Sequence, residues 1–103
     1  MDIVAGIREK FAQNQFEFSR HAVARTILRM ISVQEVREAI QMSELIEDYP
    51  DDKYGPSCLL LGFTRSQRAL HIQVSYPSRS FVKIITVYEP DPLDWVEWRF
   101  RRH

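Results

Sequence analysis

The second half of the chain contains three consecutive stretches of branched and aromatic residues, joined by connections of only four residues each. The stretches are CLLLGFT, ALHIQVSY and FVKIITVYE, and the connections are RSQR and PSRS. Runs of this kind are typical of β-strands. Because connections this short cannot hold a parallel crossover, they predict an antiparallel meander. One earlier strand is predicted at ELIEDYP, followed by the turn residues of DDKYGPS.

The part of the chain before these strands has helical periodicity instead. A first helix is predicted from Asp2 to about Asn14, with QFEFS as a short extended link after it. Ser19 is a candidate N-cap for a second helix. Ser32 is another for a third helix that ends near Met42, and Glu35 completes a capping box there. Helices followed by strands predict one α+β domain over residues 1–103, with the N-terminal helices on one face of a three- to four-stranded antiparallel sheet.

Alternation along the predicted strands assigns their side chains to the two faces of the sheet. In ALHIQVSY, the polar residues His71, Gln73 and Ser75 should point away from the helices. In FVKIITVYE neither set of alternating residues is polar, which predicts a central strand buried on both faces. Strict alternation also places Lys83 and Thr86 on opposite faces. The face away from the helices is then open to a ligand.

The second helix combines an apolar side with a basic stripe. His21, Arg25 and Arg29 follow one another at steps of four and lie within about 80° on a helical wheel. The opposite side is predicted to face the core. It consists of Val23, Ala24, Ile27, Leu28, Met30 and Ile31.

Charges are segregated along the chain although the net charge is zero. Residues 35–52 hold seven acidic residues and one arginine, whereas residues 53–88 hold five basic residues and no acidic one. Eleven of the fourteen cationic residues are arginine, whose planar fork suits phosphate. This pattern predicts a basic side that holds a polyanion and an acidic side that avoids one. A pair of ordinary solvated surfaces would give the same pattern.

Several classes of protein are not indicated. The single cysteine, Cys58, lies in an apolar run and is predicted to be a buried thiol. With no long apolar segment in the sequence, we expect a cytoplasmic protein without a membrane partner. His21, His71 and His103 lack the spacing of metal ligands, so neither a metal nor another cofactor is expected.

Two motifs resemble the DUF4258 family of small bacterial proteins. The first is HAVARTILRMIS with EV after it, and the second is LHIQV followed by IITVYEPDPLDW. The resemblance runs from about Phe18 to Trp95. One departure is Met30, which stands where the family usually has glycine and which bears on the direction of Arg29. Family residues carried over onto this sequence are His21, Arg25, Arg29, His71, Thr86 and Tyr88.

The resemblance implies a RelE/ParE-like or BrnT-like toxin of a type II toxin–antitoxin pair. Its partners would be a cognate antitoxin, with the zinc-finger type as one candidate, and RNA or ribosome-bound mRNA. The implied activity is metal-independent endoribonucleolytic cleavage. Such cleavage needs an acid–base group and cations for the phosphate charge, roles that suit His71 or His21 and arginine. On this hypothesis the catalytic candidates are His71, His21, Arg29 and Tyr88, and the RNA contacts are Arg25, Arg79, Lys83 and Thr86.

Each candidate also has an ordinary structural explanation. His71 would then be a strand histidine bonded to a neighbour, and Tyr88 a packed tyrosine. The chain as a whole would be a non-catalytic module that binds nucleic acid or protein in the same groove. The C-terminal DPLDWVEWRFRRH is predicted as either a short helix capped near Asp91 or an extended edge. Its aromatic residues are interleaved with arginines, which would suit RNA or an antitoxin equally. They are Trp95, Trp98 and Phe100, and Arg99, Arg101 and Arg102.

Overall fold

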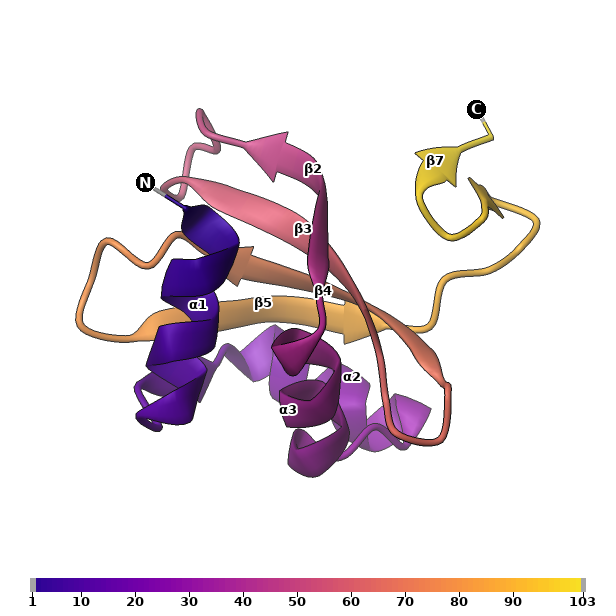
Figure 1. Cartoon of the computed structure of the whole chain (residues 1–103), viewed down its shortest axis with the longest axis horizontal. Helices are drawn as coiled ribbons and strands as arrows, with labels where there is room; N and C mark the ends of the chain where they lie inside the picture. The colour runs from indigo at the N-terminus through magenta and orange to yellow at the C-terminus, as the bar shows by residue number, and fades with distance from the viewer. Residues whose placement is uncertain (1, 103) are drawn as a thin grey trace.

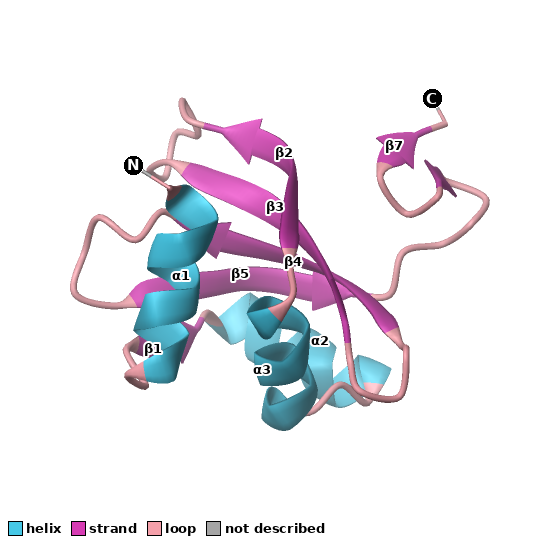
Figure 2. Ribbon diagram, in the orientation of Figure 1, coloured by secondary structure: helices cyan, strands magenta, loops and turns pink. Residues whose placement is uncertain are grey.

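The computed structural model describes residues 2–102 and contains three helices and a five-stranded, mostly antiparallel sheet (Figures 1 and 2). The helices precede most of the strands, as predicted, and the whole chain forms a mixed α and β structure. In chain order the elements are α1 (Ile3–Ala12), β1 (Phe16–Phe18), α2 (Arg20–Arg29), α3 (Val33–Gln41), β2 (Glu44–Tyr49), β3 (Ser57–Phe63), β4 (Ala69–Ser75), β5 (Val82–Tyr88), β6 (Trp95–Val96) and β7 (Phe100–Arg101).

The sheet has the strand order β1-β5-β4-β3-β2. The meander from β2 to β5 is antiparallel, which confirms the prediction from the short connections. The prediction of three to four strands is wrong, because QFEFS forms β1 rather than a link. This short strand adds to the first half of β5 in parallel register, with Phe16 opposite Val82 and Phe18 opposite Ile84.

Side-chain caps begin all three helices. Asp2 accepts a hydrogen bond from the backbone of Ala5, and Ser19 accepts one from Ala22. Ser32 and Glu35 form the predicted capping box, each side chain bonding the other's backbone N–H. Caps of this kind satisfy donors that would otherwise have no partner at a helix start. The predicted helix starts are therefore confirmed to within a residue.

The main hydrophobic core lies between helices α1 and α3 and one face of the sheet. Helix side chains such as Ile7, Phe11 and Val36 meet strand residues of β3, β4 and β5 there. We call this the inner face of the sheet and the opposite one the outer face. Buried inner-face residues are Cys58, Leu60, Leu70, Ile72, Val74, Val82, Ile84 and Val87. Cys58 is buried as predicted, and burial raises the pKa of its thiol to about 12.

Helix α2 has the opposite orientation to the predicted one. Its buried side is formed by Ala22, which has no exposed surface, whereas Ile27 is 74% exposed and Leu28 71% exposed. The helix lies along the half of the β5 edge that β1 leaves uncovered. Ser19 bonds to the carbonyls of Ile84 and Ile85, and small Ala22 permits this close approach. Val23, Ile27, Leu28 and Met30 of the predicted apolar side therefore face outward, whereas Ile31 is buried as predicted. Of the basic stripe, Arg25 and Arg29 are half-buried and His21 is exposed.

A β-bulge in β5 changes which of its side chains share a face. Val74 pairs with Ile84 and Gln73 pairs with Thr86, so Ile85 is an extra residue between two pairs. Because directly opposed residues share a face, Thr86 and Tyr88 lie on the outer face with Gln73 and His71. Lys83 lies on this face too, next to inner-facing Ile84. The predictions that Thr86 and Lys83 oppose each other and that β5 is buried on both faces are therefore wrong.

Residues 90–102 fold back over one end of the outer face as a segment that contains β6 and β7. These two short strands pair with each other and belong to no other sheet (Figure 1). The sequence predicts this segment as a short helix capped near Asp91 or as an extended edge, and it is neither of these throughout. It begins with turns capped by Asp91 and continues as a small hairpin. Its tryptophans Trp95 and Trp98 pack edge-on against His71 and Phe63 of the sheet. Part of the outer face is thus occupied by the chain itself.

Candidate functional site

His71 lies on β4 under this C-terminal segment and has no solvent-exposed surface. Its Nδ1 is 3.1 Å from the hydroxyl of Tyr88, the residue directly opposite on β5. Its Nε2 is 2.6 Å from the backbone carbonyl of Trp98. The rings of Trp95 and Tyr88 pack edge-on against the imidazole. Both ring nitrogens therefore have partners within the chain.

These partners define the tautomer of the neutral imidazole. A carbonyl oxygen only accepts hydrogen bonds, so Nε2 carries the proton and donates it to Trp98. Nδ1 is then unprotonated and accepts the O–H of Tyr88. Burial lowers the pKa of His71, against an opposing contribution from the Trp98 carbonyl, and so favours this neutral form. Burial also raises the pKa of Tyr88, which keeps its hydroxyl protonated.

Arg29, at the end of α2, joins this pair from the side. Its Nη1 donates a hydrogen bond of 2.7 Å to the carbonyl of Val87, at the part of the β5 edge without a neighbouring strand. Its guanidinium carbon lies 5.9 Å from the centre of the Tyr88 ring. One arginine therefore supplies a donor to an open sheet edge and a positive charge beside Tyr88. Arg29, His71 and Tyr88 come from three different elements and form what we call the histidine cluster.

The C-terminal segment completes this cluster and leaves two small cavities beside Tyr88. One of about 290 Å³ is lined by Arg29, Tyr88 and Trp95 together with the carboxylates of Glu89, Asp91 and Asp94. The other, of about 280 Å³, is lined by Tyr88, Asp94, Trp95 and Arg101. Tyr88, Asp94 and Trp95 line both cavities, and the hydroxyl of Tyr88 is bonded to His71 behind it.

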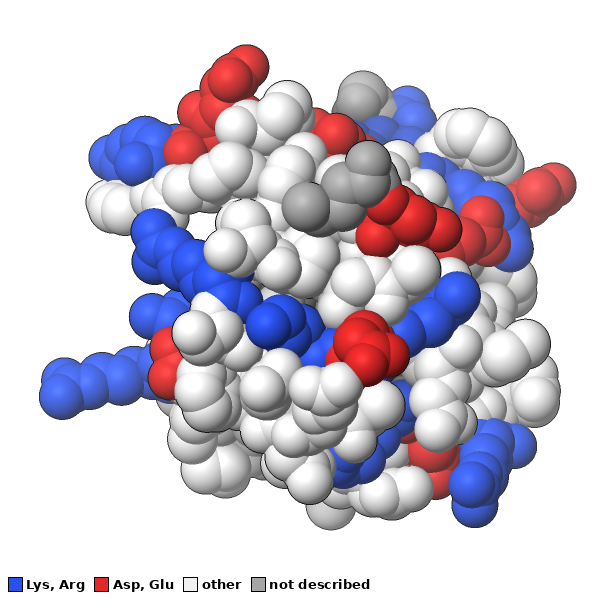
Figure 3. Space-filling model, turned by 60° about the vertical axis from the view of Figure 1, so that its left-hand side comes forward, with Lys and Arg blue, Asp and Glu red and all other residues white. Residues whose placement is uncertain are grey.

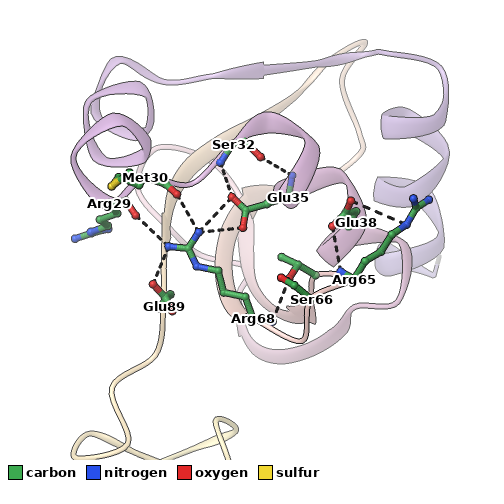
Figure 4. A network of polar contacts seen from close by, with 10 residues as sticks. Arg29, Met30, Ser32, Glu35, Glu38, Arg65, Ser66, Arg68 and Glu89 are labelled. Carbon is green, nitrogen blue, oxygen red and sulfur yellow. Dashed lines mark hydrogen bonds and ion pairs between the residues drawn. The ribbon is translucent and has the colours of Figure 1, made fainter.

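Arg68 anchors α2 and the end of β5 from the turn between β3 and β4. Its guanidinium donates hydrogen bonds to the carbonyls of Arg29 and Met30, which lack partners within α2 (Figure 4). It also pairs with Glu35 at 3.0 Å and with Glu89 at 2.7 Å. The hydrogen bond from the Ser32 backbone, followed by Arg68, lowers the pKa of Glu35. This network holds Arg29 in its position at the cluster.

The charges that are separated along the sequence are interleaved in space. Arg65 and Arg68 of the basic stretch pair with Glu38 and Glu35 of the acidic stretch. The C-terminal arginines Arg99 and Arg101 pair with Glu44 and Glu47 on β2. On the side of the molecule seen in Figure 3, basic and acidic side chains alternate without forming two separate areas. The predicted division into a basic and an acidic side is therefore wrong.

The other predicted site residues lie on α2, along β5 and in the β4–β5 loop. His21 is exposed on α2 and Arg25 is half-buried, and neither joins the hydrogen bonds of the histidine cluster within residues 2–102. Thr86 lies on the outer face between the two ends of β5. Lys83 and Arg79 line a larger cavity at the far end of that strand. The structure thus brings together three of the eight predicted residues.

Two negative observations concern the described residues alone. Within residues 2–102 no three His, Cys, Asp or Glu side chains are placed to hold a metal ion, and His103 lies outside that range. No helix of the described part is long and apolar enough to cross a membrane.

Comparison with protein families agrees with the two sequence motifs. A family model described as a domain of unknown function, DUF4258, matches residues 18–89. The chain belongs to the DUF4258 family. No curated protein and no solved structure matches it. The DUF4258 match contains Arg29, His71 and Tyr88 but ends before residues 90–102, so the segment that covers the histidine cluster lies outside it.

Sequence reasoning missed the contribution of that segment to the cluster. Trp95, the carbonyl of Trp98 and Arg101 all lie around His71 or Tyr88, whereas the sequence predicts them only as parts of a separate tail. Arg101 also lies 4.7 Å from the Trp95 ring centre. The available signal was the pair of large aromatic residues Trp95 and Trp98 in a short segment, since such side chains are usually buried at least in part.

Proposed function

We propose that this DUF4258 protein is the toxin of a type II toxin–antitoxin pair and that it cleaves mRNA, free or on the ribosome, without a metal ion. The observation that carries the proposal is the convergence of Arg29, His71 and Tyr88 from α2, β4 and β5. These side chains offer a cation, a neutral imidazole and a hydroxyl that bonds to it. Acid–base groups beside a cation are what RNA cleavage without a metal requires.

The geometry suggests a separate role for each residue. Tyr88 faces the cavities and contacts the RNA, while His71 lies behind it and accepts the hydrogen bond from its hydroxyl. When the 2′-hydroxyl of RNA attacks the adjacent phosphorus, its proton passes to Tyr88 and the tyrosine proton passes to Nδ1 of His71. The phosphorus–5′-oxygen bond breaks, the leaving 5′ oxygen takes a proton from a solvent water, and His71 later returns its extra proton to the solvent, so that the products are a 2′,3′-cyclic phosphate and a 5′-hydroxyl. Arg29 stabilises the negative charge on the phosphate oxygens.

RNA binding in this proposal requires movement of residues 90–102. Asp91 and Asp94 line the cavity beside Arg29, and their carboxylates would repel a phosphate there. The segment is attached mainly by the contacts around Trp95 and Trp98 and by ion pairs of Arg99 and Arg101. Exposed ion pairs of this kind contribute only about 0–1 kcal/mol each. We therefore propose that RNA or the ribosome displaces the segment.

A cognate antitoxin belongs to the same proposal. The exposed side of α2 carries Val23, Ile27, Leu28 and Met30 next to one another. Apolar side chains gathered on a surface favour a protein partner, because contact with the partner removes them from water. We propose that the antitoxin covers this side of α2 and that both proteins are cytoplasmic.

The proposal is tested by inducible expression in a bacterial host while growth is followed and RNA 5′ ends are mapped. Wild type should arrest growth and create new 5′ ends. Tyr88→Phe keeps the ring but removes the hydroxyl, and we expect it to lower cleavage by about a hundredfold or more. Arg65→Ala removes one exposed cation away from the cluster and should cleave like wild type. A folded wild-type protein that leaves both growth and RNA unchanged would contradict the proposal.

A non-catalytic binding module is the second candidate. It is favoured by the burial of His71 and by the two hydrogen bonds that occupy both its nitrogens within the chain. On this alternative, replacing single arginines should weaken nucleic-acid binding by similar amounts and reduce its salt dependence, and Tyr88→Phe should have no special effect. Growth arrest without RNA fragments would instead indicate a toxin that acts on a protein.

A further inference from the structure

A larger cavity lies at the opposite end of the outer face from the histidine cluster. Its volume is about 470 Å³, which is within the range of small-molecule sites. Its walls come from β1, the β2–β3 loop, the β4–β5 loop and the adjoining parts of β4 and β5. They include two acidic residues, Glu17 and Asp52, which pair with Lys83 and with the Ser57 hydroxyl. The residues important here are Tyr54, Arg79, Phe81 and Lys83.

Two aromatic side chains at this cavity are exposed. Tyr54 is 85% exposed and Phe81 is 52% exposed, and they belong to two different loops. Lys53 lies 4.9 Å from the centre of the Tyr54 ring. The core needs neither ring, since both leave most or half of their surface in solvent. Exposed aromatic rings beside cations are typical of proteins that stack the bases of single-stranded nucleic acid.

Arg79 and Lys83 bring positive charge to the same cavity. Arg79 reaches from one loop toward the other, because its Nη2 would lie 4.0 Å from a Cβ placed on Gly55. No hydrogen bond or ion pair engages its guanidinium among residues 2–102. Lys83 is 3.8 Å from Glu17 in a pair open to solvent, which leaves the ammonium available to a stronger partner. Both side chains are therefore free to bind a phosphate.

We propose that this cavity binds one nucleotide of single-stranded RNA, with the base against Phe81 and Tyr54 and the phosphate on Arg79 and Lys83. The inference rests on the proposed function and adds a subsite to it. Lys83 and Tyr88 lie on the outer face of the same strand, about 15 Å apart at the usual rise of a strand. Thr86 and Gln73 lie between them on that face. An RNA strand along β5 thus meets this cavity several nucleotides from the cleavage point.

The test measures binding of a short fluorescein-labelled single-stranded RNA by anisotropy. All proteins carry Tyr88→Phe so that the RNA stays intact, and far-UV circular dichroism checks their folding. Phe81→Ala should weaken binding about tenfold, and Phe81→Trp should restore it, because stacking needs an aromatic face. Arg79→Ala should weaken binding and reduce its salt dependence. Arg65→Ala removes another exposed arginine, which lies outside the cavity, and should bind like the parent protein.

The outcomes separate this inference from the function on which it rests. If wild type cuts RNA but Phe81→Ala and Arg79→Ala bind it as tightly as their parent, the cavity is not a nucleotide subsite and the proposed function stands. If RNA is neither cut nor bound, the proposed function fails. In that case, titration of the 15N-labelled protein with AMP and with GMP, followed by its amide NMR signals, tests the cavity independently of the proposed function. Shifts of the Gly55 and Lys83 amide signals would support a site for free nucleotides, and unchanged signals would overturn it.

Discussion

Met30 stands where the resemblance to the DUF4258 motif implies a glycine. It ends α2 with φ 54° and ψ 48°, in the left-handed region that glycine adopts without strain. The backbone N–H groups of Met30 and Ile31 still bond to carbonyls of the last helical turn. The turn into α3 is therefore formed despite the side chain, at a cost in backbone strain.

Met30→Gly should raise the free energy of unfolding by about 1 kcal/mol, because an L-residue in this conformation is strained by about 1–2 kcal/mol. The Met30 side chain is exposed, so its removal creates no cavity. Met42→Gly is the matched control, since Met42 also ends a helix and is exposed but has φ −119°. It should lower stability by about 0.5 kcal/mol. Urea unfolding measures both, and equal effects would contradict the strain.

His71 contributes to the pH dependence of stability. Because the folded state lowers its pKa below 6.5, the unfolded chain binds a proton more readily than the folded one. The stability associated with neutral His71 is therefore complete above pH 6.5. It is lost progressively as the pH falls from 6.5 toward the lower pKa of the folded state.

We expect the urea concentration at the unfolding midpoint of the wild type to decrease as the pH is lowered from 7.5 to 5.5. His71→Gln lacks the titrating group, so the decrease over this range should be smaller even though the variant is less stable at each pH. Equal slopes for the two proteins would show that His71 is not buried in the neutral form. The wild-type and variant midpoints at pH 7.5 provide the common reference for the comparison.

At the scale of single elements, α2 is the helix whose buried side could not be predicted from its sequence. Its apolar and basic sides are both evident from spacing, but spacing alone leaves open which of them faces the sheet. The backbone carbonyls at the open edge of β5 need hydrogen-bond donors, and this decides the orientation. Ser19 and Arg29 donate to the carbonyls of Ile85 and Val87. Ala22, the smallest side chain on that side, allows the helix to approach.

Ala22→Leu and Leu28→Lys distinguish the two orientations of α2. In the observed orientation, Ala22→Leu should destabilise the protein by about 1–3 kcal/mol through overpacking. Leu28→Lys should change stability by about 0.5 kcal/mol or less, because Leu28 is largely exposed. Chemical denaturation measures both. If α2 instead buried its apolar side, the magnitudes would be reversed.

In strand β5, one extra residue makes the assignment of side chains to sheet faces by strict alternation wrong. The caps, the meander and the burial of Leu70, Ile72 and Val74 were all predictable from local patterns. Ile85 is not, since a bulge depends on the register with β4 rather than on the composition of β5. That single residue places Thr86 and Tyr88 on the outer face beside His71, and the histidine cluster depends on it.

At the scale of the whole molecule, residues 90–102 form a separately attached unit over the outer face. Their strands pair only with each other, and they are held by aromatic contacts, the His71–Trp98 bond and two ion pairs. Glu97 and Trp98 both have positive φ, a strained conformation for bulky residues. A unit with these features belongs to the part of a protein that opens most easily.

Unfolding in urea should therefore occur in two steps. Both tryptophans of the chain, Trp95 and Trp98, lie in this segment, so tryptophan fluorescence reports on its detachment alone. We expect the fluorescence transition to precede the far-UV circular dichroism transition of the helices and sheet. Replacing Arg99 and Arg101 with alanine should widen the separation. Coincident transitions would show that the segment unfolds together with the sheet.

The sequence alone determined the features that depend on neighbours a few residues apart. These are the three helix starts, the order of helices and strands, the antiparallel meander and the motifs of the DUF4258 family. Tertiary structure decided which side of α2 is buried, where the charges of Glu35 and Glu47 find partners, and how the C-terminal segment covers His71. The reason is physical: caps and alternation are local, whereas edge pairing, bulge position and ion pairing depend on which distant segments meet.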